Sequence, residues 1–279
     1  MAKTLVSVPA PTPVNPERRM PASRIRTGFV GGPLGYRILS ALGHATDDPK
    51  GCTGSAYQEH SKLEILFGPE IWRRIDGKTV VDVGCGLGAE AIDMARHGAR
   101  RVVGIDILDR VLETARTAAR REGVADRCVF TRNIDQTADV VISVDAFEHY
   151  DDPDAMVSAM LKMLNPGGEI FATFGPTWFH PYGGHLFSVF PWAHLIFTEP
   201  ALIRWRSDFK TDGATRFSEV EGGLNQMTIR AFRHVVTRDD VVVKELEAVP
   251  IRRLRRFHNR LTEEFFTSYV RCRLGARQT

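Results

Sequence analysis

The sequence VVDVGCGLG, residues 80–88, decides the fold. A run of β-branched residues ends in Gly84, Gly86 and Gly88, and a helical pattern of apolar residues follows. Glycines let the backbone turn tightly and approach a ligand, because no Cβ stands in the way, and the first turn of a helix offers free amide groups. A strand, a glycine turn and a helix in this order predict a site for a nucleotide-like ligand.

Two acidic residues accompany this turn. Asp82 lies near the end of the first strand, where its carboxylate would repel a pyrophosphate but could hold the amino group of a ligand. Asp106 ends the next strand, where a carboxylate commonly accepts hydrogen bonds from both ribose hydroxyls. The structural alternatives are an acid that caps the turn and a cap for the following helix. A dinucleotide site also stays open, because Gly84, Gly86 and Ala89 satisfy that pattern.

From residue 79 onward, short β-branched runs alternate with helical patterns. This alternation is typical of a doubly wound α/β fold, in which helices cover both faces of a mainly parallel sheet. The predicted strands span residues 79–83, 101–105, 127–131, 139–144, 169–174, 240–249 and 264–274. The predicted helices span residues 56–75, 87–97, 108–119, 153–164 and 227–236. Residues 175–226 interrupt the alternation and are predicted to be an insertion after the fifth strand.

The composition is that of an ordinary globular protein. Of 279 residues, 43% are hydrophobic and 25% are charged. Residues 1–50 begin with a segment rich in proline and arginine and are predicted to form a mobile extension, whereas residues 51–279 are predicted to form the folded domain. Four cysteines without paired spacing indicate neither a disulfide framework nor a zinc site, which favours a reducing cytoplasm. No secretory signal and no uninterrupted apolar run of about 20 residues is evident.

Basic residues gather near the C-terminus, in Arg252, Arg253, Arg255, Arg256 and Arg260. Such a cluster is either a solvated surface or a contact for phosphate groups, and the solvated surface is the commoner case. The formal net charge of the chain is only +3, so a nucleic-acid partner is disfavoured.

A second unusual stretch, FGPTWFHPYGGHLFSVFPWAHLIF, spans residues 174–197, and no charged residue occurs between Ile170 and Thr198. Three interpretations are open: buried core, a membrane contact, and the wall of a pocket for an apolar substrate. A transmembrane helix is disfavoured because three prolines and the Gly183–Gly184 pair interrupt the stretch. Its place directly after the fifth strand favours the pocket wall. The predicted substrate-binding residues are Tyr57, Trp178, Phe179, Tyr182 and Phe187.

Four ordered motifs carry a resemblance to a known family. They are VVDVGCGLG, then VVGIDI, DVVISVDAFEHYDDP and LNPGGEIFATF. Together they resemble the class I S-adenosylmethionine-dependent methyltransferases, and within them the small-molecule branch, methyltransferase type 11, that includes quinone-biosynthesis enzymes. The resemblance implies a Rossmann-like sheet of seven strands with an antiparallel last strand. It also implies S-adenosylmethionine as the cofactor, bound at the carboxyl ends of the strands.

The resemblance also assigns cofactor-binding residues by position. They are Asp82, Gly84, Cys85, Gly86, Gly88, Asp106, Ile107, Asn133, Ile134, Asp145, Ala146 and Phe147. Asp82 would contact the amino group of the methionine part, Asp106 the ribose, and Ile107 the adenine. Asn133 and Ile134, after the third strand, match the place where the family contacts the edge of the adenine. Because the connection there is short in this sequence, the polar contact is assigned to Asn133 or Asp135.

Methyl transfer from a sulfonium needs positioning and exclusion of water more than acid–base groups. An oxygen or nitrogen acceptor must still lose a proton, and a nearby base helps this step. The candidates are Glu148, His149, His180, His185 and His194. His185 and His180 are the preferred bases, and His149 is a further catalytic candidate. Glu148 with two of the histidines matches no established metal-binding pattern, so no metal is expected.

The leading hypothesis is a methyltransferase for a small aromatic or apolar acceptor, with O-methylation favoured. One alternative is a methyltransferase for RNA or protein that uses the C-terminal arginines. The other is a non-catalytic protein with the cofactor fold, docked on a membrane or partner through its aromatic insertion. The sequence leaves the acceptor and the oligomeric state open.

Overall fold

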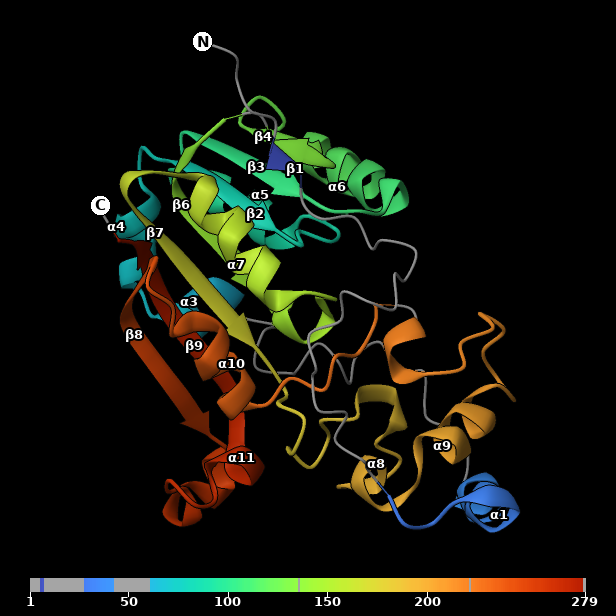
Figure 1. Ribbon diagram of the computed structural model, residues 1–279. Helices are drawn as coiled ribbons and strands as arrows, with labels where there is room; N and C mark the ends of the chain where they lie inside the picture. The colour runs from blue at the N-terminus through green and yellow to red at the C-terminus, as the bar shows by residue number, and fades with distance from the viewer. Residues whose placement is uncertain (1–5, 8–27, 43–60, 135, 221, 278–279) are drawn as a thin grey trace.

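The computed structural model describes residues 6–7, 28–42, 61–134, 136–220 and 222–277 (Figure 1). Its centre is a seven-stranded sheet with the order β4-β3-β2-β6-β7-β9-β8. These strands span Cys128–Thr131 (β4), Arg101–Ile105 (β3), Thr79–Val83 (β2), Ala138–Val144 (β6), Leu164–Phe174 (β7), Thr267–Ala276 (β9) and Val241–Pro250 (β8). Neighbours from β4 to β7 are parallel, whereas β9 is antiparallel to β7 and β8. The predicted α/β sheet with an antiparallel last strand is confirmed.

The last strand, β9, begins at Thr267 rather than residue 264, because Glu263–Phe266 form the short helix α11. The largest difference from the predicted strands is at β7. This strand begins at Leu164 rather than residue 169, because Ala138 already pairs with Leu164 and an irregularity follows that pair. A small additional sheet pairs β1 (Val6–Ser7) with β5 (Asn133–Ile134) in antiparallel register. Two-residue strands leave no alternation in a sequence, so this pair was not predicted.

One face of the sheet is covered by helices α3 (Lys62–Phe67), α4 (Glu70–Ile75), α5 (Ala89–Arg96) and α6 (Asp109–Arg121). Their fully buried side chains include Leu63, Ile71 and Leu112, which pack in one core with strand residues such as Val102. The helix predicted over residues 56–75 is two short helices within its described part. The reason is Gly68, which has a positive φ of 79° and ends α3.

The opposite face is covered by α7 (Pro153–Lys162) and α10 (Ile229–Val236). Met156 and Met160 of α7 and Phe232 of α10 are buried in the core that they share with the sheet. The predicted start of α7 is confirmed, because the side chain of Asp152 accepts a hydrogen bond of 2.9 Å from the backbone N–H of Ala155. The two helical layers thus give the sheet the doubly wound arrangement that the alternation predicts.

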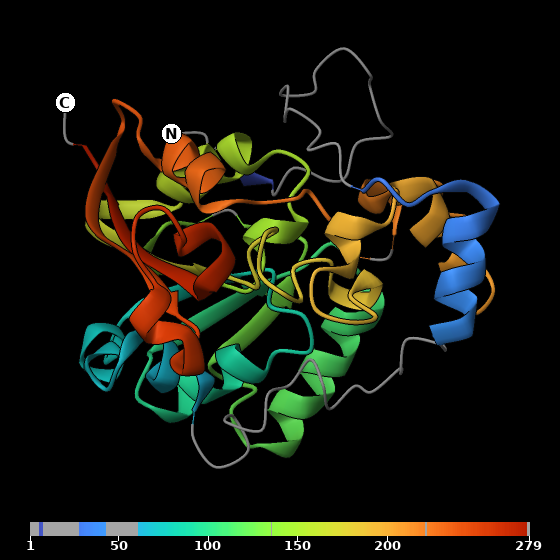
Figure 2. The same ribbon diagram turned by 90° about the horizontal axis from the view of Figure 1, so that it is seen from below.

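The insertion, residues 175–226, contains α8 (Ala193–Ile196) and α9 (Glu199–Arg206) and has a core of its own. This core includes a residue from the other end of the chain, Leu39 of α1 (Gly32–Leu42), and α1 lies beside α9 in both views (Figures 1 and 2). Residues 28–42 of the predicted extension therefore pack against the insertion. None of the helices within the described ranges is both long and apolar enough to cross a membrane.

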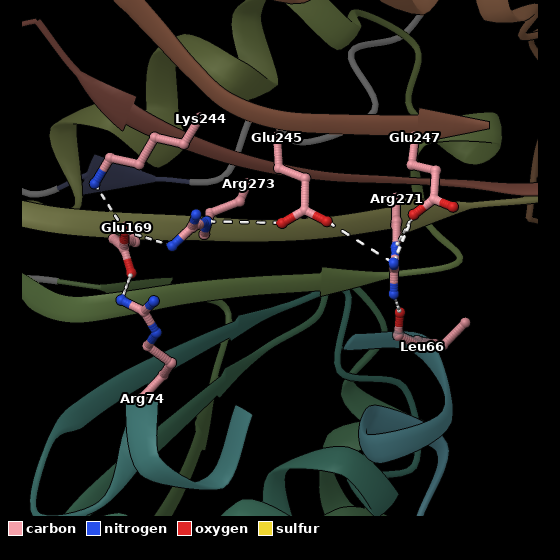
Figure 3. Close-up of polar contacts among 8 residues, drawn as sticks. All are labelled: Leu66, Arg74, Glu169, Lys244, Glu245, Glu247, Arg271 and Arg273. Atoms are coloured by element: carbon pink, nitrogen blue, oxygen red, sulfur yellow. Dashed lines mark hydrogen bonds and ion pairs between the residues drawn. The ribbon is translucent and has the colours of Figure 1, made fainter. Parts of the chain in front are cut away.

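Ion pairs and one hydrogen bond connect β7, β9 and β8 to α3 and α4 (Figure 3). Glu169 of β7 pairs with Lys244 of β8 at 2.7 Å and with Arg74 of α4 at 3.2 Å. Arg271 of β9 pairs with Glu247 of β8 and donates a hydrogen bond of 3.0 Å to the carbonyl oxygen of Leu66, in the last turn of α3. These contacts fix α3, whose first residue reaches the site described next.

Candidate active site

The glycine turn after β2 brings the backbone to the carboxyl end of the sheet. Gly84, Gly86 and Gly88 have φ values of 78°, 50° and 82°, a region that favours glycine. A Cβ at position 86 would meet no atom of the described residues within 4 Å, so the backbone here borders space that these residues leave open. A Cβ at position 88 would lie 2.8 Å from the side chains of Ala115 and Phe130. Gly86 therefore allows approach by a ligand, whereas Gly88 allows close packing of α5.

Asp106, directly after β3, orders this turn. One of its carboxylate oxygens accepts a 3.0 Å hydrogen bond from the backbone N–H of Gly86, and the other a 2.9 Å bond from that of Leu108. Asp106 therefore caps the glycine turn and the N–H just before α6, but it is not the cap of that helix, whose N-cap is Leu108 without a side-chain cap hydrogen bond among the described residues. Each oxygen keeps a further lone pair, and the side chain is only half-buried, so the carboxylate can also accept two ligand hydroxyls.

Asp82 is a buried carboxylate beneath the same turn. Its side chain is 2% exposed, and its Oδ2 has no hydrogen-bond partner among the residues that the structure describes. Burial, and next the charge of Glu90, raise the pKa of Asp82 well above its usual value. A cationic amino group would supply the missing partner, so Asp82, Gly86 and Asp106 fit the methionine and ribose parts of S-adenosylmethionine.

A second segment, at the carboxyl end of β6, faces this turn. Asp145 has a positive φ of 48° and pairs with Nζ of Lys62, the first residue of α3, at 2.8 Å. Ala146 is buried near the turn, since a Cβ at Gly84 would lie 3.3 Å from its methyl group. Phe147, predicted to line the cofactor, has its ring in the sheet core against Phe232, so only its backbone can face a ligand.

The 3₁₀ turn Phe147–His149 and the insertion bring three polar side chains together. Glu148, His149 and His185 each place an oxygen or nitrogen atom within 4.8 Å of those of the others. The rings of His149 and His185 lie at 62° with centroids 5.3 Å apart. Nδ1 of His149 donates to the carbonyl oxygen of Gly223 at 2.8 Å, so this nitrogen carries a proton and Nε2 is the ring nitrogen left for a ligand. Three of the predicted candidates therefore form one cluster.

Burial sets the protonation of this cluster. Oε1 of Glu148 accepts a 3.3 Å hydrogen bond from the backbone N–H of Gly175, and Oε2 is buried with no partner among the described residues. Burial, with the charge of Asp145, raises the pKa of Glu148 to about 8. Burial lowers the pKa of His185 to about 3, and its Nε2 is likewise buried and unpartnered within the described ranges. At neutral pH the cluster therefore holds a protonated carboxyl beside a neutral imidazole.

The other two histidines of the stretch have structural partners. Nδ1 of His180 accepts a 3.0 Å hydrogen bond from the backbone N–H of Tyr182, and burial lowers the pKa of His180 to about 4. His194 is fully buried between the carbonyl oxygen of Trp178 at 2.7 Å and the hydroxyl of Ser188 at 3.2 Å. His185 is thus the histidine of the insertion that faces the candidate site.

The aromatic residues predicted to bind the substrate divide into two groups. Trp178 and Phe187 are buried in the core of the insertion, where both rings pack on Phe217. Phe179 is half-buried, and Tyr182 is 51% exposed. Tyr57 lies outside the described residues. Part of the aromatic stretch is therefore plain core, and Phe179 and Tyr182 keep surface that a ligand can contact.

The adenine side of the predicted site depends on β5. Asn133 is exposed, whereas Ile134 has its side chain in the sheet core, and Ile107 is half-buried. Asp135 lies outside the described residues. Cys85 is buried in the other core, and burial raises the pKa of its thiol, so its part in the turn is through its backbone.

Besides Lys62, two further contributors to the site were not predicted. Tyr150 donates or accepts a 2.8 Å hydrogen bond with the hydroxyl of Ser143, and its own hydroxyl is near the turn at Gly84. Asn225 donates from its side chain to the carbonyl oxygens of Phe147 and Tyr150, at 2.6 and 2.8 Å. Asn225 thereby holds the end of the insertion on the 3₁₀ turn, a contact between distant residues that no local pattern signals.

The strand order, the glycine turn after β2 and the acid after β3 together define a class I S-adenosylmethionine-dependent methyltransferase domain. Residues 81–172 match the family described as "Methyltransferase domain". The match ends just before the insertion begins.

Individual relatives support this assignment over part of the chain. A "Ubiquinone biosynthesis O-methyltransferase" of Neisseria meningitidis serogroup A is 42% identical over 34% of this chain and 43% of its own length. A "Ribosomal protein L11 methyltransferase" of Photobacterium profundum is 37% identical over 39% of this chain and 36% of its own length. The chain thus spans less than half the length of these curated relatives.

Among solved structures, magnesium protoporphyrin IX methyltransferase from Synechocystis PCC 6803 is similar, with a TM-score of 0.49 and 17% sequence identity. The similarity covers 77% of this chain and 80% of that one.

Proposed function

We propose that the protein transfers the methyl group of S-adenosylmethionine to an oxygen atom of a small apolar acceptor. The observation that carries the proposal is the cluster of Glu148, His149 and His185 at the junction of the cofactor-side turn and the aromatic insertion. When bound, S-adenosylmethionine supplies a methyl group on a positively charged sulfur, which an acceptor displaces in line.

The cofactor side rests on three groups. Oδ2 of Asp82, which has no partner among the described residues, would accept from the amino group, and the carboxylate of Asp106 would accept from the ribose hydroxyls. The amides and open surface at Gly86 would receive the methionine part. Asp145, Ala146 and the backbone of Phe147 would face it from β6, and Ile107 and Asn133 would lie toward the adenine.

On the acceptor side, His185 would orient and deprotonate a hydroxyl. Its Nε2 has no partner among the described residues and is an acceptor when Nδ1 carries the proton of the ring, which burial keeps uncharged at neutral pH. A neutral ring with a pKa of about 3 is a weak base, and an ionised Glu148 nearby would strengthen it by stabilising the imidazolium. We therefore expect the rate of transfer to rise as pH approaches about 8, where Glu148 loses its proton. Glu148→Gln should flatten that rise.

The nature of the acceptor rests on the insertion. The family match ends at residue 172, and relatives that match this chain include both an enzyme of ubiquinone biosynthesis and one named for a ribosomal protein. The shared segment therefore does not distinguish a small molecule from a protein. Phe179 and Tyr182, close in sequence to His185, favour a small aromatic or apolar acceptor, because they offer apolar surface beside a polar group.

Two measurements test the proposal. Calorimetry should detect binding of S-adenosylmethionine and of its demethylated product, and folded protein that binds neither would refute the cofactor assignment. Incubation with methyl-labelled cofactor and pools of phenols, quinols and other hydroxylated apolar compounds should label one class of compound. Labelling of a protein or RNA pool instead would replace the small-molecule acceptor with the alternative one.

A further inference from the structure

The connection between β8 and β9, residues 251–266, is an exposed basic surface at the same edge of the sheet as the insertion. Strand β8 runs in the direction of β7, because both are antiparallel to β9. The end of β8 therefore lies at the carboxyl edge, and Figure 1 shows this connection and the insertion both at the lower end of the molecule. The rings of Phe179 and Phe265 lie 5.3 Å apart, so the two segments touch.

The charges of this connection are segregated. Both of its acidic residues have partners elsewhere in the chain. Glu263 pairs with Arg233, and Glu264 accepts hydrogen bonds from the backbone N–H groups at the start of α10. Its five arginines are exposed, and none has an ion pair with a carboxylate of the described residues. They are Arg252, Arg253, Arg255, Arg256 and Arg260. The outward charge of the connection is therefore wholly positive.

Large apolar side chains stand among these arginines. Leu261 is 91% exposed, Phe257 is 47% exposed and Phe265 is 40% exposed. The position of Leu261 is ordered, because its backbone N–H donates a 2.9 Å hydrogen bond to the side chain of Asn259. The connection itself is closed by a 2.8 Å hydrogen bond from the N–H of Ile251 to the carbonyl oxygen of Phe266. A folded turn thus holds an aliphatic side chain out in water.

We infer that residues 251–266 form a docking surface for an anionic lipid bilayer. Unpaired arginines are complementary to acidic headgroups, and leucine and phenylalanine gain free energy by entering the boundary between headgroups and acyl chains. A nucleic acid would use the same arginines but would gain nothing from an exposed aliphatic side chain such as Leu261, since bases stack on flat side chains. The inference rests on this surface alone and does not depend on methyl transfer.

Vesicle flotation tests the docking surface. The full chain is mixed with vesicles of phosphatidylcholine alone, or of phosphatidylcholine with phosphatidylserine, and the floated fraction is measured at low and high salt. We expect binding only to the anionic vesicles, and weaker binding at high salt. The double variant Arg252→Ser/Arg253→Ser should bind about 25-fold more weakly, from about fivefold for each arginine near an anionic surface. Leu261→Ser should bind about tenfold more weakly with its charge unchanged.

A matched control variant distinguishes the effect of arginines on this surface from the effect of a lower net charge. Arg121→Ser/Arg277→Ser removes the same charge from the end of α6 and the end of β9, which lie at the opposite edge of the sheet. This control should bind the anionic vesicles like the unchanged protein. Equal loss in both double variants, or no flotation of the unchanged protein, would overturn the inference. Binding to an RNA homopolymer that needs the arginines but tolerates Leu261→Ser, without flotation, would assign the surface to nucleic acid instead.

Discussion

The imidazole rings of His149 and His185 meet edge to face, with 5.3 Å between their centroids. One ring follows β6 at the carboxyl end of the sheet, and the other belongs to the insertion. The contact joins the segment that faces the cofactor turn to the segment that carries exposed aromatic surface. The proposed cofactor site and the proposed acceptor site are therefore adjacent at this pair of rings.

Removing His185 should separate binding from transfer. The residue has a positive φ of 51°, so His185→Asn is the suitable change, because asparagine tolerates that conformation. We expect transfer to the acceptor to fall by roughly 10² to 10⁴-fold, the usual contribution of a general base, with unchanged affinity for S-adenosylmethionine. His180→Asn, a change in the same stretch, is the control and should keep most of the activity. Equal turnover in both variants would return His185 to a structural role.

Asp106→Ala should abolish measurable binding of the cofactor. The carboxylate would lose its contacts with the ribose and also its hydrogen bonds to the N–H groups of Gly86 and Leu108. Charged hydrogen bonds contribute about 1.5–3 kcal/mol each, so we expect calorimetric affinity to fall by about 10²-fold or more. Asp109→Ala, an exposed acid nearby on α6, should bind normally. Similar affinity in the two variants would remove Asp106 from the site.

Glu148 should make stability depend on pH in a defined direction. The folded state holds its proton up to a pKa of about 8, whereas an unfolded glutamate releases it near 4.5, so the free energy of unfolding falls as pH rises between these values. His185 has the opposite effect, because burial lowers its pKa from 6.5 to about 3. Its contribution makes the free energy of unfolding rise with pH between these values, and this contribution no longer changes above pH 6.5.

The window from pH 6.5 to about 8 therefore separates the contribution of Glu148 from that of His185. Urea unfolding there should show a loss of up to about 1.4 kcal/mol per pH unit from this one proton. Glu148→Gln should remove that slope, while the contribution of Asp82, common to both proteins, cancels in the difference. Parallel curves for the two proteins would mean that Glu148 is ionised in the folded state.

Gly88→Ala should destabilise the fold more than a glycine change at an open position. Its Cβ would lie 2.8 Å from Ala115 and Phe130, which cannot both move without disturbing α6 and β4. Gly123→Ala is the matched control, because Gly123 also has a positive φ, 70°, but a Cβ there would have no atom of the described residues within 4 Å. The control should lose about 1–2 kcal/mol from backbone strain, and Gly88→Ala about 1–3 kcal/mol more. Denaturant unfolding measures both, and equal losses would contradict the packing role.

Leu39→Ala should loosen the insertion while the sheet stays intact. Leu39 is fully buried in the core of the insertion, and truncating such a side chain costs about 2–5 kcal/mol. Hydrogen exchange should therefore quicken in α9 and remain slow in β2 and β6. Ile38→Ala, one residue earlier and 38% exposed, should leave both unchanged. Faster exchange throughout the sheet would show that the insertion core is not a separate unit.

The sheet and the cofactor-side turn were predictable because their signals are local. Strand β2, Gly84 to Gly88 and the first turn of α5 are consecutive in the chain, so sequence order alone brings them together. Asp106 is placed by the parallel pairing of β3 with β2, which the alternation of strands and helices implies. The four motifs therefore predicted both the fold class and the position of the glycine turn.

The acceptor side was predictable only in part, because its contacts are between distant residues. The sequence marks His185 and Glu148 as candidates, but only the folded insertion shows that His185 faces Glu148 while His194 is fully buried. The sequence also does not distinguish Phe187, which is in the core, from Tyr182, which is on the surface. Both lie in one uncharged stretch whose apolar residues show no clear helical or strand periodicity. Lys62 and Asn225 reach the site from segments with no motif.

The core of the insertion joins segments of the chain that are synthesised far apart in time. Helix α1 leaves the ribosome early, yet the partner that buries Leu39 includes α9, which is made only after five strands of the sheet. Contacts between such distant segments form late, because closing a long loop costs chain entropy before it gains any burial. The insertion should therefore be the last part to assemble, and a nascent chain stalled before α9 would carry the parallel half of its sheet beside an unpaired α1.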